Sequence, residues 1–210
     1  MIVLGLTGSI GMGKSTASKM LRRMGVPIYD ADAEVHRMMR PGGEALKPVL
    51  AAFPEAGSLK TGVDRVVLGK QVFGDPAALK RLEKIIHPRL GDCRQRFLRR
   101  HRGRRTPVVI LDVPLLFEIR NERDCDAVIV VTAPPFLQRA RVMARPHMTT
   151  ERLRTILKKQ IPDAEKRRRA DFIAWTGLGK APTQRALAAV IRAARHGEIR
   201  KRKKRPVLRR

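Results

Sequence analysis

A glycine-rich stretch near the N-terminus limits what this chain can fold into more than any other feature. Residues 2–7 read Ile-Val-Leu-Gly-Leu-Thr, an apolar and partly β-branched run that predicts a buried strand. Residues 8–16 read Gly-Ser-Ile-Gly-Met-Gly-Lys-Ser-Thr, which matches the P-loop pattern G-x-x-x-x-G-K-S/T. A helix is predicted over 15–24, and Gly25 ends it. Because strand, loop and helix follow in the order that the pattern requires, we interpret the stretch as a nucleotide phosphate site rather than a chance glycine-rich turn.

The residue types in this loop each have a predicted task. Glycine is needed where a Cβ would block positive φ angles or the approach of backbone N–H groups to a phosphate. Lys14 is expected to reach the β- and γ-phosphates, and the Ser15 hydroxyl to hold Mg²⁺. The N-terminal dipole of the following helix attracts the anion. The predicted nucleotide-binding residues are Gly11, Met12, Gly13, Lys14, Ser15 and Thr16.

The charge of the chain indicates an anionic partner without identifying it. The 210 residues carry a net charge of +27. Residues 197–210 contribute +7 of this, with eight Lys or Arg against Glu198, so the rest of the chain carries +20. A field of this size attracts a phosphorylated metabolite, a nucleic acid or an anionic surface. A single Trp and a single Tyr disfavour a nucleic-acid platform that stacks bases.

Membrane and secreted classes are disfavoured by the sequence pattern. Asp112 and Pro114 interrupt the best candidate for a membrane-spanning run. The first apolar run has no charged segment before it and is the predicted P-loop strand, so we predict no signal peptide. Cys93 and Cys125 are isolated and lack metal-ligand spacing, as expected in a reducing compartment. We therefore expect a cytoplasmic protein in which 1–196 form one domain.

The rest of the chain alternates predicted strands and helices. Further strands are predicted at 26–30, 107–112, 127–132 and 171–175. Helices are predicted before Pro41 and at 44–53, 64–73, 76–87, 88–100, 134–145, 149–160 and 182–196, with Asp64 and Asp75 as N-caps and a break at His87-Pro88. This alternation predicts a parallel sheet covered on both faces. Residues from about 33 to 104 form a helical block too long for a simple crossover, so we interpret them as an insertion.

Acidic side chains follow two of the predicted strands. Asp30 and Asp32 come directly after the strand at 26–30, where open α/β sheets place ligands. Either one is a candidate functional carboxylate, and either one fits a helix N-cap equally well. Asp112 ends the strand at 107–112, where P-loop enzymes hold Mg²⁺ through water, although a plain strand-end residue is the alternative.

Motifs beyond the P-loop identify a family resemblance. They are Asp30-Ala31-Asp32, Arg65 with Val72-Phe73, Leu82-Glu83 with His87-Pro88, the run Asp-Val-Pro-Leu-Leu-Phe-Glu at 112–118, Gln138 with Arg141 and Arg145, Gln160, and Ala170-Asp171. In these residues and their order, over about 2–175, the chain resembles the dephospho-coenzyme A kinase family. The P-loop alone is unspecific, whereas the whole set at these separations is specific.

The resemblance implies both a fold and a reaction. The fold is a P-loop NTPase of the nucleoside monophosphate kinase type, a three-layer α/β/α arrangement with a five-stranded parallel sheet. It implies a helical insertion at about 33–104 that binds coenzyme A, and a mobile lid at about 138–165. The reaction is transfer of the γ-phosphate of ATP, with Mg²⁺, to the 3′-hydroxyl of dephospho-coenzyme A. Both substrates are polyanions, which suits the basic chain without any nucleic acid.

Roles for single residues follow from the resemblance. Asp32 is expected to act as the base or to position the acceptor hydroxyl, with Asp30 as the competing choice. Lys14 and Arg141 are expected to meet the charge of the transferring phosphate. Arg141 and Arg145 are four residues apart and are predicted to share one helical face. The alternative is that this face is simply basic and solvated.

Substrate and metal roles complete the predicted site. Arg65 and His87 are expected at the dephospho-coenzyme A site, with a surface role for Arg65 and a structural role for His87 at the helix break as alternatives. Ser15 is the expected Mg²⁺ ligand, and Asp112 the candidate that acts through water.

The chain departs from the family pattern at three places. Ser9 and Met12 stand where the family usually has Gly and Ser, but contacts there are mainly made by the backbone. The run Trp-Thr-Gly-Leu-Gly at 175–179 lacks the Asn that usually precedes the glycine near the adenine. The basic tail at 197–210 has no family counterpart, and we interpret it as a disordered charged run with non-specific polyanion or RNA binding as the sharper prediction.

Two other kinds of protein remain as alternatives. Another small-molecule or nucleoside monophosphate kinase of the same fold would share the P-loop but not the motifs at 30–32 and 112–118. The other alternative is a nucleic-acid-binding ATPase or a GTP switch. A GTPase would carry an Asn/Thr-Lys-x-Asp run, and no Lys-x-Asp occurs in the chain. We expect the protein to work as a monomer.

Overall fold

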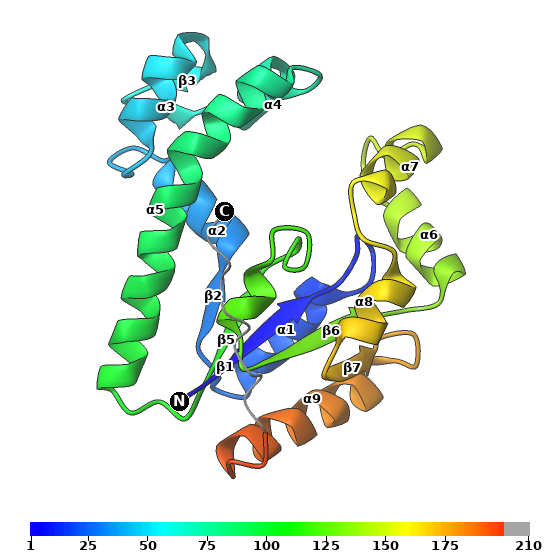
Figure 1. The fold of residues 1–210 in the computed structure, drawn as a ribbon. Coiled ribbons are helices and arrows are strands. Elements are labelled where there is room, and N and C mark those ends of the chain that lie inside the picture. The colour runs from blue at the N-terminus through cyan, green and yellow to red at the C-terminus, as the bar shows by residue number, and fades with distance from the viewer. Residues whose placement is uncertain (200–210) are drawn as a thin grey trace, which may run out of the picture. The chain divides into compact units, whose positions relative to one another are not determined.

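The computed structural model describes residues 1–199, which divide into two compact units (Figure 1). The α/β unit comprises Met1–Tyr29 and the chain from Arg105 onward, and the helical unit comprises Asp30–Arg104. No helix within 1–199 is long and apolar enough to cross a membrane. The second unit contains the helical block at 33–104, and the coenzyme A role of that block stays a prediction.

The α/β unit is built on a five-stranded sheet with the order β2-β5-β1-β6-β7 (Figure 1). The strands are β1 (Ile2–Thr7), β2 (Ile28–Asp30), β5 (Val108–Asp112), β6 (Ala127–Thr132) and β7 (Phe172–Trp175). In the central strand, Leu4 lies opposite Ile110 on one side and Ala127 on the other, and both pairings are parallel. The predicted α/β fold with a five-stranded parallel sheet is confirmed.

The two faces of this sheet are covered differently. Side chains at alternate positions of β1, including Leu4 and Leu6, form one core with helices α1 (Lys14–Arg23) and α9 (Lys180–Arg195). On the other face, a Cβ added at Gly5 would meet Leu116 and Cys125, so this face is covered by the segment between β5 and β6. That segment includes the 3₁₀ helix η2 (Asn121–Asp124). Because side chains alternate along a strand, neighbouring residues of β1 serve separate cores.

Two helices of this unit end at glycines in the left-handed conformation. Gly25 has φ +72° and Gly197 has φ +75°. After α9, the Glu198 N–H bonds the Ala193 carbonyl and the Gly197 N–H bonds the Ala194 carbonyl, which is a Schellman ending. The turn directs the chain back, and Ile199 packs into the core. The packed chain thus extends past the tail boundary expected at Gly197, and residues 200–210 of the predicted tail lie outside the described residues.

Three further helices follow β6 (Figure 1). They are α6 (Pro135–Met143), α7 (Thr150–Lys158) and α8 (Asp163–Arg169). Helix α8 was not predicted, because its sequence Asp-Ala-Glu-Lys-Arg-Arg-Arg shows no apolar stripe. Its buried position is filled by Lys166, whose ammonium lies 2.9 Å from the Glu118 carboxylate.

The helical unit contains four α-helices and a small hairpin. The helices are α2 (Ala31–Met38), α3 (Leu46–Ala52), α4 (Arg65–Val72) and α5 (Pro76–Gly103). The 3₁₀ helix η1 (Pro54–Ala56) leads into the hairpin of β3 (Gly57–Ser58) and β4 (Gly62–Val63), which the sequence did not predict. Asp64 and Asp75 accept hydrogen bonds from the first N–H groups of α4 and α5, so both predicted N-caps are confirmed.

The predicted helix break at His87-Pro88 is wrong. Helix α5 runs for 28 residues with Pro88 inside it. Proline removes one N–H donor and crowds the preceding turn, which normally ends or kinks a helix. Here the Arg89 guanidinium donates a hydrogen bond of 2.7 Å to the Ile85 carbonyl, which satisfies an acceptor of that turn. The structural role expected of His87 at a break therefore has no basis.

Candidate functional site

The strand–loop–helix at the N-terminus places a lysine on a buried carboxylate. The Lys14 ammonium lies 2.6 Å from Oδ1 of Asp112, the last residue of β5. The Lys14 side chain is 16% exposed and that of Asp112 only 3%. β1 and β5 are parallel neighbours, so their C-terminal ends bring these two residues together at one edge of the sheet. The Asp112 carboxylate thus holds the Lys14 ammonium at the end of the loop, where phosphates are expected.

The backbone of the loop has no room for side chains at its glycines. Gly11 and Gly13 have φ angles of +76° and +91°, which β-carbons disfavour. A Cβ at Gly11 would also lie 2.6 Å from Val142 of α6, and one at Gly13 would lie 3.0 Å from the Thr176 hydroxyl. The glycines thus let α6 and the segment after β7 approach the loop closely.

Met12 occupies a buried position within the loop. Its sulfur lies 3.1 Å from the Ala133 N–H, which donates to it. The side chain therefore connects the loop to the residue after β6, a contact that a shorter serine would not reach. From the sequence, Met12 in place of the usual serine was expected to have little consequence, whereas the structure shows a specific packing role for its side chain.

Arg141 is connected to the same loop by hydrogen bonds through Thr176. Its guanidinium donates to the Thr176 hydroxyl and to the Thr176 carbonyl, both at 2.9 Å. The Thr176 hydroxyl in turn donates to the Met12 carbonyl at 2.8 Å. Thr176 was not predicted as a site residue, although its place directly after the last strand, next to Gly177, was the available signal.

The pairing of Arg141 with Arg145 is wrong. Helix α6 ends at Met143, and the Arg145 N–H bonds the Val142 carbonyl in the following turn. The two arginines therefore do not share a helical face. Arg145 is exposed, whereas Arg141 is half-buried against Thr176.

Oxygen donors suited to Mg²⁺ are present at the loop. Ser15 is exposed in the first turn of α1, and Asp112 ends the neighbouring strand. Hydroxyl, carboxylate and water oxygens are the ligands that Mg²⁺ prefers, so these residues fit the ion. Because Lys14 already contacts Asp112 Oδ1, Asp112 fits an indirect role through water better than direct ligation. Residues 1–199 contain no cluster of three or more His, Cys, Asp or Glu arranged to hold a metal by themselves.

Three predicted site residues belong to the helical unit. Asp32 lies in the first turn of α2, Arg65 begins α4, and His87 lies in the middle of α5; all three are exposed. Asp30 is the N-cap of α2, where its Oδ1 accepts a 3.0 Å hydrogen bond from the Ala33 N–H. Of the two carboxylates left open by the sequence, Asp30 thus has a capping role and Asp32 does not.

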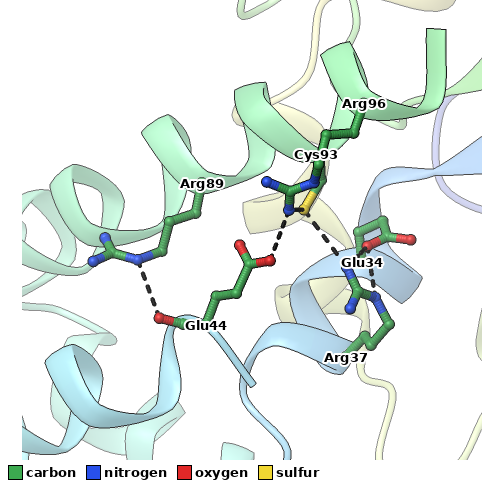
Figure 2. A network of polar contacts seen from close by, with 6 residues as sticks. All are labelled: Glu34, Arg37, Glu44, Arg89, Cys93 and Arg96. Atoms are coloured by element: carbon green, nitrogen blue, oxygen red, sulfur yellow. Dashed lines mark hydrogen bonds and ion pairs between the residues drawn. The ribbon is translucent and has the colours of Figure 1, made fainter. Parts of the chain in front are cut away.

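The helical unit also contains a polar network that the sequence did not suggest (Figure 2). Arg96 of α5 and Arg37 of α2 approach the Cys93 sulfur at 3.0 and 3.6 Å. Arg96 also pairs with Glu44, and Arg37 with Glu34, both at 2.7 Å. Burial raises the pKa of the Cys93 thiol above its usual value although Arg96 opposes the shift. The thiol is thus kept protonated and packs α2 against α5.

Comparison with known proteins gives a consistent result. The family model described as dephospho-CoA kinase matches residues 2–176. A protein of that name from Paramagnetospirillum magneticum is 60% identical over 80% of this chain and 78% of its own length. Another from Novosphingobium aromaticivorans is 52% identical over 92% of this chain and 94% of its own length.

Two solved structures resemble this one over nearly the whole chain. TT1252 from Thermus thermophilus superposes with a TM-score of 0.77 at 34% identity, covering 91% of this chain and 96% of that one. Dephospho-CoA kinase from Campylobacter jejuni superposes with a TM-score of 0.70 at 26% identity, covering 93% and 98%.

Proposed function

Because this chain belongs to the dephospho-CoA kinase family, we propose a division of tasks among its own residues in the family reaction. The protein is a kinase that transfers phosphate from ATP to the 3′-hydroxyl of dephospho-coenzyme A, giving coenzyme A and ADP in the last step of coenzyme A synthesis. Such a transfer depends on positioning and on neutralising charge more than on covalent chemistry. Each proposed task below is of one of these two kinds.

The loop at 8–16 takes the phosphates of ATP. The observation that carries this proposal is the Lys14–Asp112 pair at the end of the strand–loop–helix. An ammonium held there meets the β- and γ-phosphates, and the loop residues Gly11, Met12, Gly13, Ser15 and Thr16 surround them. Ser15, and Asp112 through water, would hold Mg²⁺, which when bound would supply neutralisation of the phosphate charge.

Asp32 acts on the acceptor. As a carboxylate it accepts the proton of the attacking hydroxyl or orients that hydroxyl. Its exposure supports the proposal, as does the capping role of Asp30, which leaves Asp32 as the better candidate. Arg65 contacts the phosphates of dephospho-coenzyme A, and His87 lies at the same substrate site.

Arg141 stabilises the charge of the transferring phosphate. Its hydrogen bonds to Thr176 hold the guanidinium beside the loop. Because the hydroxyl and carbonyl of Thr176 are neutral acceptors, a charged phosphate oxygen can replace them. The segment at 138–165 then serves as the lid, and its closure would exclude the water that otherwise hydrolyses ATP.

The protein works as a cytoplasmic monomer, with polyanion or RNA contact through 197–210.

Acceptor specificity is tested by ATP consumption with dephospho-coenzyme A, adenosine and the common nucleoside monophosphates measured side by side. Turnover is expected with dephospho-coenzyme A alone. Turnover with a nucleoside monophosphate instead would favour another kinase of the same fold, and no turnover with dephospho-coenzyme A would refute the assignment.

The role of Asp32 is tested by a matched pair of variants. Asp32→Asn is expected to lower kcat by about 10²–10⁴-fold while ATP still binds. Asp30→Asn keeps an oxygen acceptor for the Ala33 N–H and is expected to retain most activity. If Asp30→Asn instead removes turnover and Asp32→Asn does not, the two roles are reversed.

A further inference from the structure

In the phosphate loop, the backbone N–H and the backbone carbonyl of Ile10 are both hydrogen-bonded to glutamine side chains. The Ile10 N–H donates to Oε1 of Gln160 at 3.1 Å. The Ile10 carbonyl accepts from Nε2 of Gln138 at 2.8 Å. Gln138 is a buried residue of α6, and Gln160 follows the end of α7. One residue of the loop is thus held by the two ends of the segment 138–160.

The two glutamines themselves lie on well-held backbone. Directly after Gln160, the Ile161 N–H donates to Oε1 of Glu118 at 2.9 Å. The Thr132 hydroxyl, at the end of β6, donates to Asp163 at 2.8 Å. Residues 160–163 are therefore bonded to the segments that follow β1 and β5 and to the end of β6.

The Gln138 end is held by close packing. A Cβ at Gly11 would lie 2.9 Å from the Gln138 carbonyl, which shows how near the backbone of α6 comes to the loop. The Gln138 N–H bonds the Pro134 carbonyl in the first turn of the helix. Both ends of 138–160 are thus fixed against the loop, and lid motion would be confined to the residues between them.

We propose that Gln138 and Gln160 are positioning residues that fix the orientation of the Ile10 peptide groups and so hold the phosphate loop ready for ATP. A P-loop binds an anion through inward-pointing N–H groups, and a carbonyl that turned toward the phosphates would repel them. Bonded to Gln138, the Ile10 carbonyl is kept from turning. The proposal rests on the ATP site proposed above and adds how the lid segment supports that site.

The two glutamines have opposite hydrogen-bonding polarity, which gives the proposal a sharp test. Gln160 accepts, so glutamate can replace it and still accept from the Ile10 N–H. Gln138 donates, and an ionised glutamate there would place a carboxylate against the Ile10 carbonyl. Gln138→Glu and Gln160→Glu add the same charge beside Ile10, so both variants should repel ATP to a similar extent. The ratio of their ATP affinities therefore reflects the gain or loss of the hydrogen bond to Ile10.

The test measures ATP affinity by calorimetry at pH 8 without acceptor. Gln138→Glu is expected to weaken ATP binding about tenfold more than Gln160→Glu does. Neutral Gln138→Met and Gln160→Met should each weaken binding about tenfold, and in a separate kinase assay with acceptor KM for ATP should rise far more than kcat falls. Gln184→Met on the exposed face of α9 is the matched control and should bind ATP as wild type does. Equal effects of the two glutamates, or unchanged affinity in both methionine variants, would overturn the proposal.

A second measurement needs neither ATP nor acceptor. Amide hydrogen exchange at Ile10, followed by NMR, should become about tenfold faster in Gln160→Met and stay unchanged in Gln184→Met. Unchanged exchange at Ile10 in Gln160→Met would contradict the proposal. A failure of acceptor specificity in the kinase assay would leave this result intact, so the two conclusions fail separately.

Discussion

The phosphate loop of the α/β unit and the Cys93 network of the helical unit are held by opposite means. Around the loop, neutral side chains bond directly to backbone groups: Gln138 and Gln160 to Ile10, and Thr176 to Met12. Around Cys93, charged side chains bond one another, and Arg37 and Arg96 are 56% and 48% exposed (Figure 2). Exposed ion pairs contribute little and are screened by salt, whereas part-buried hydrogen bonds to the backbone fix its geometry.

The difference indicates where each unit tolerates change. Two ion pairs of the α/β unit have a buried member: Asp112, which pairs with Lys14, and the fully buried Lys166, which pairs with Glu118. Removing one member of such a pair leaves an uncompensated charge in the interior. The largest effects of single substitutions on stability are therefore expected in the α/β unit.

Lys166→Met is expected to have the largest effect on stability. It leaves Glu118 without its cation and should lower the free energy of unfolding by about 3–5 kcal/mol, measured by urea titration. Lys158→Met, an exposed lysine of α7, is the control and should change it by less than about 0.5 kcal/mol. The double variant Lys166→Met with Glu118→Gln should recover part of the loss, and no recovery would contradict a role for the buried charge.

Lys14→Met is expected to affect catalysis more than any single change in the helical network. It removes the proposed phosphate contact and should lower kcat/KM for ATP by about 10²–10³-fold in the coupled kinase assay. Adding Asp112→Asn removes the carboxylate that has lost the Lys14 ammonium and should restore stability without restoring turnover. Activity close to wild type in Lys14→Met would show that another cation meets the phosphates.

Arg37→Met tests the weaker side of the comparison. It removes the half-exposed pair with Glu34 and one contact to Cys93, and should cost less than about 1 kcal/mol of stability. The cost should shrink further in 1 M NaCl, where the Debye length is about 3 Å. A large cost that salt does not reduce would mean that the network holds α2 to α5 as firmly as part-buried hydrogen bonds hold the loop.

The Cys93 thiol provides a pH-dependent test of the same network. Burial raises its pKa above the ordinary 9.0, so the folded protein keeps the proton after the unfolded chain has lost it. The unfolding free energy should therefore fall as pH rises above 9.0, and Cys93→Ser should show less of this fall in urea titrations. Equal slopes in the two proteins would contradict the buried, protonated thiol.

His101 near the end of α5 is expected to give the smallest effect. Burial, and then the charges of Arg104 and Arg100, lower the pKa of His101 below 6.5. As the pH falls, His101 takes up a proton in the unfolded chain before it does so in the folded protein. The contribution of His101 to stability is therefore lost as the pH falls through 6.5 toward the pKa of the folded protein. Arg104→Gln should raise the His101 midpoint in an NMR titration, while Arg99→Gln on the same helix should leave it unchanged.

The strands and caps were predictable because their causes are local. Apolar β-branched runs determine β1, β5 and β6, and Asp64 and Asp75 bond N–H groups only two and three residues ahead of them. The elements that were missed depend on distant partners. Helix α8 is held by ion pairs to Glu118 and Glu122, and helix α5 continues through Pro88 with help from Arg89.

The sequence by itself determined the phosphate loop, because its spacing and its glycines act within a few consecutive residues. It also carried the motifs that resemble the dephospho-coenzyme A kinase family, and with them the reaction. Only the tertiary structure decided what supports the loop: Lys14 meets Asp112, Ile10 meets Gln160, and Thr176 meets Met12, across 98, 150 and 164 residues of chain. Such contacts form when parallel strands align their carboxyl ends and the following segments pack over them. No local pattern records which distant side chain will satisfy a given backbone group.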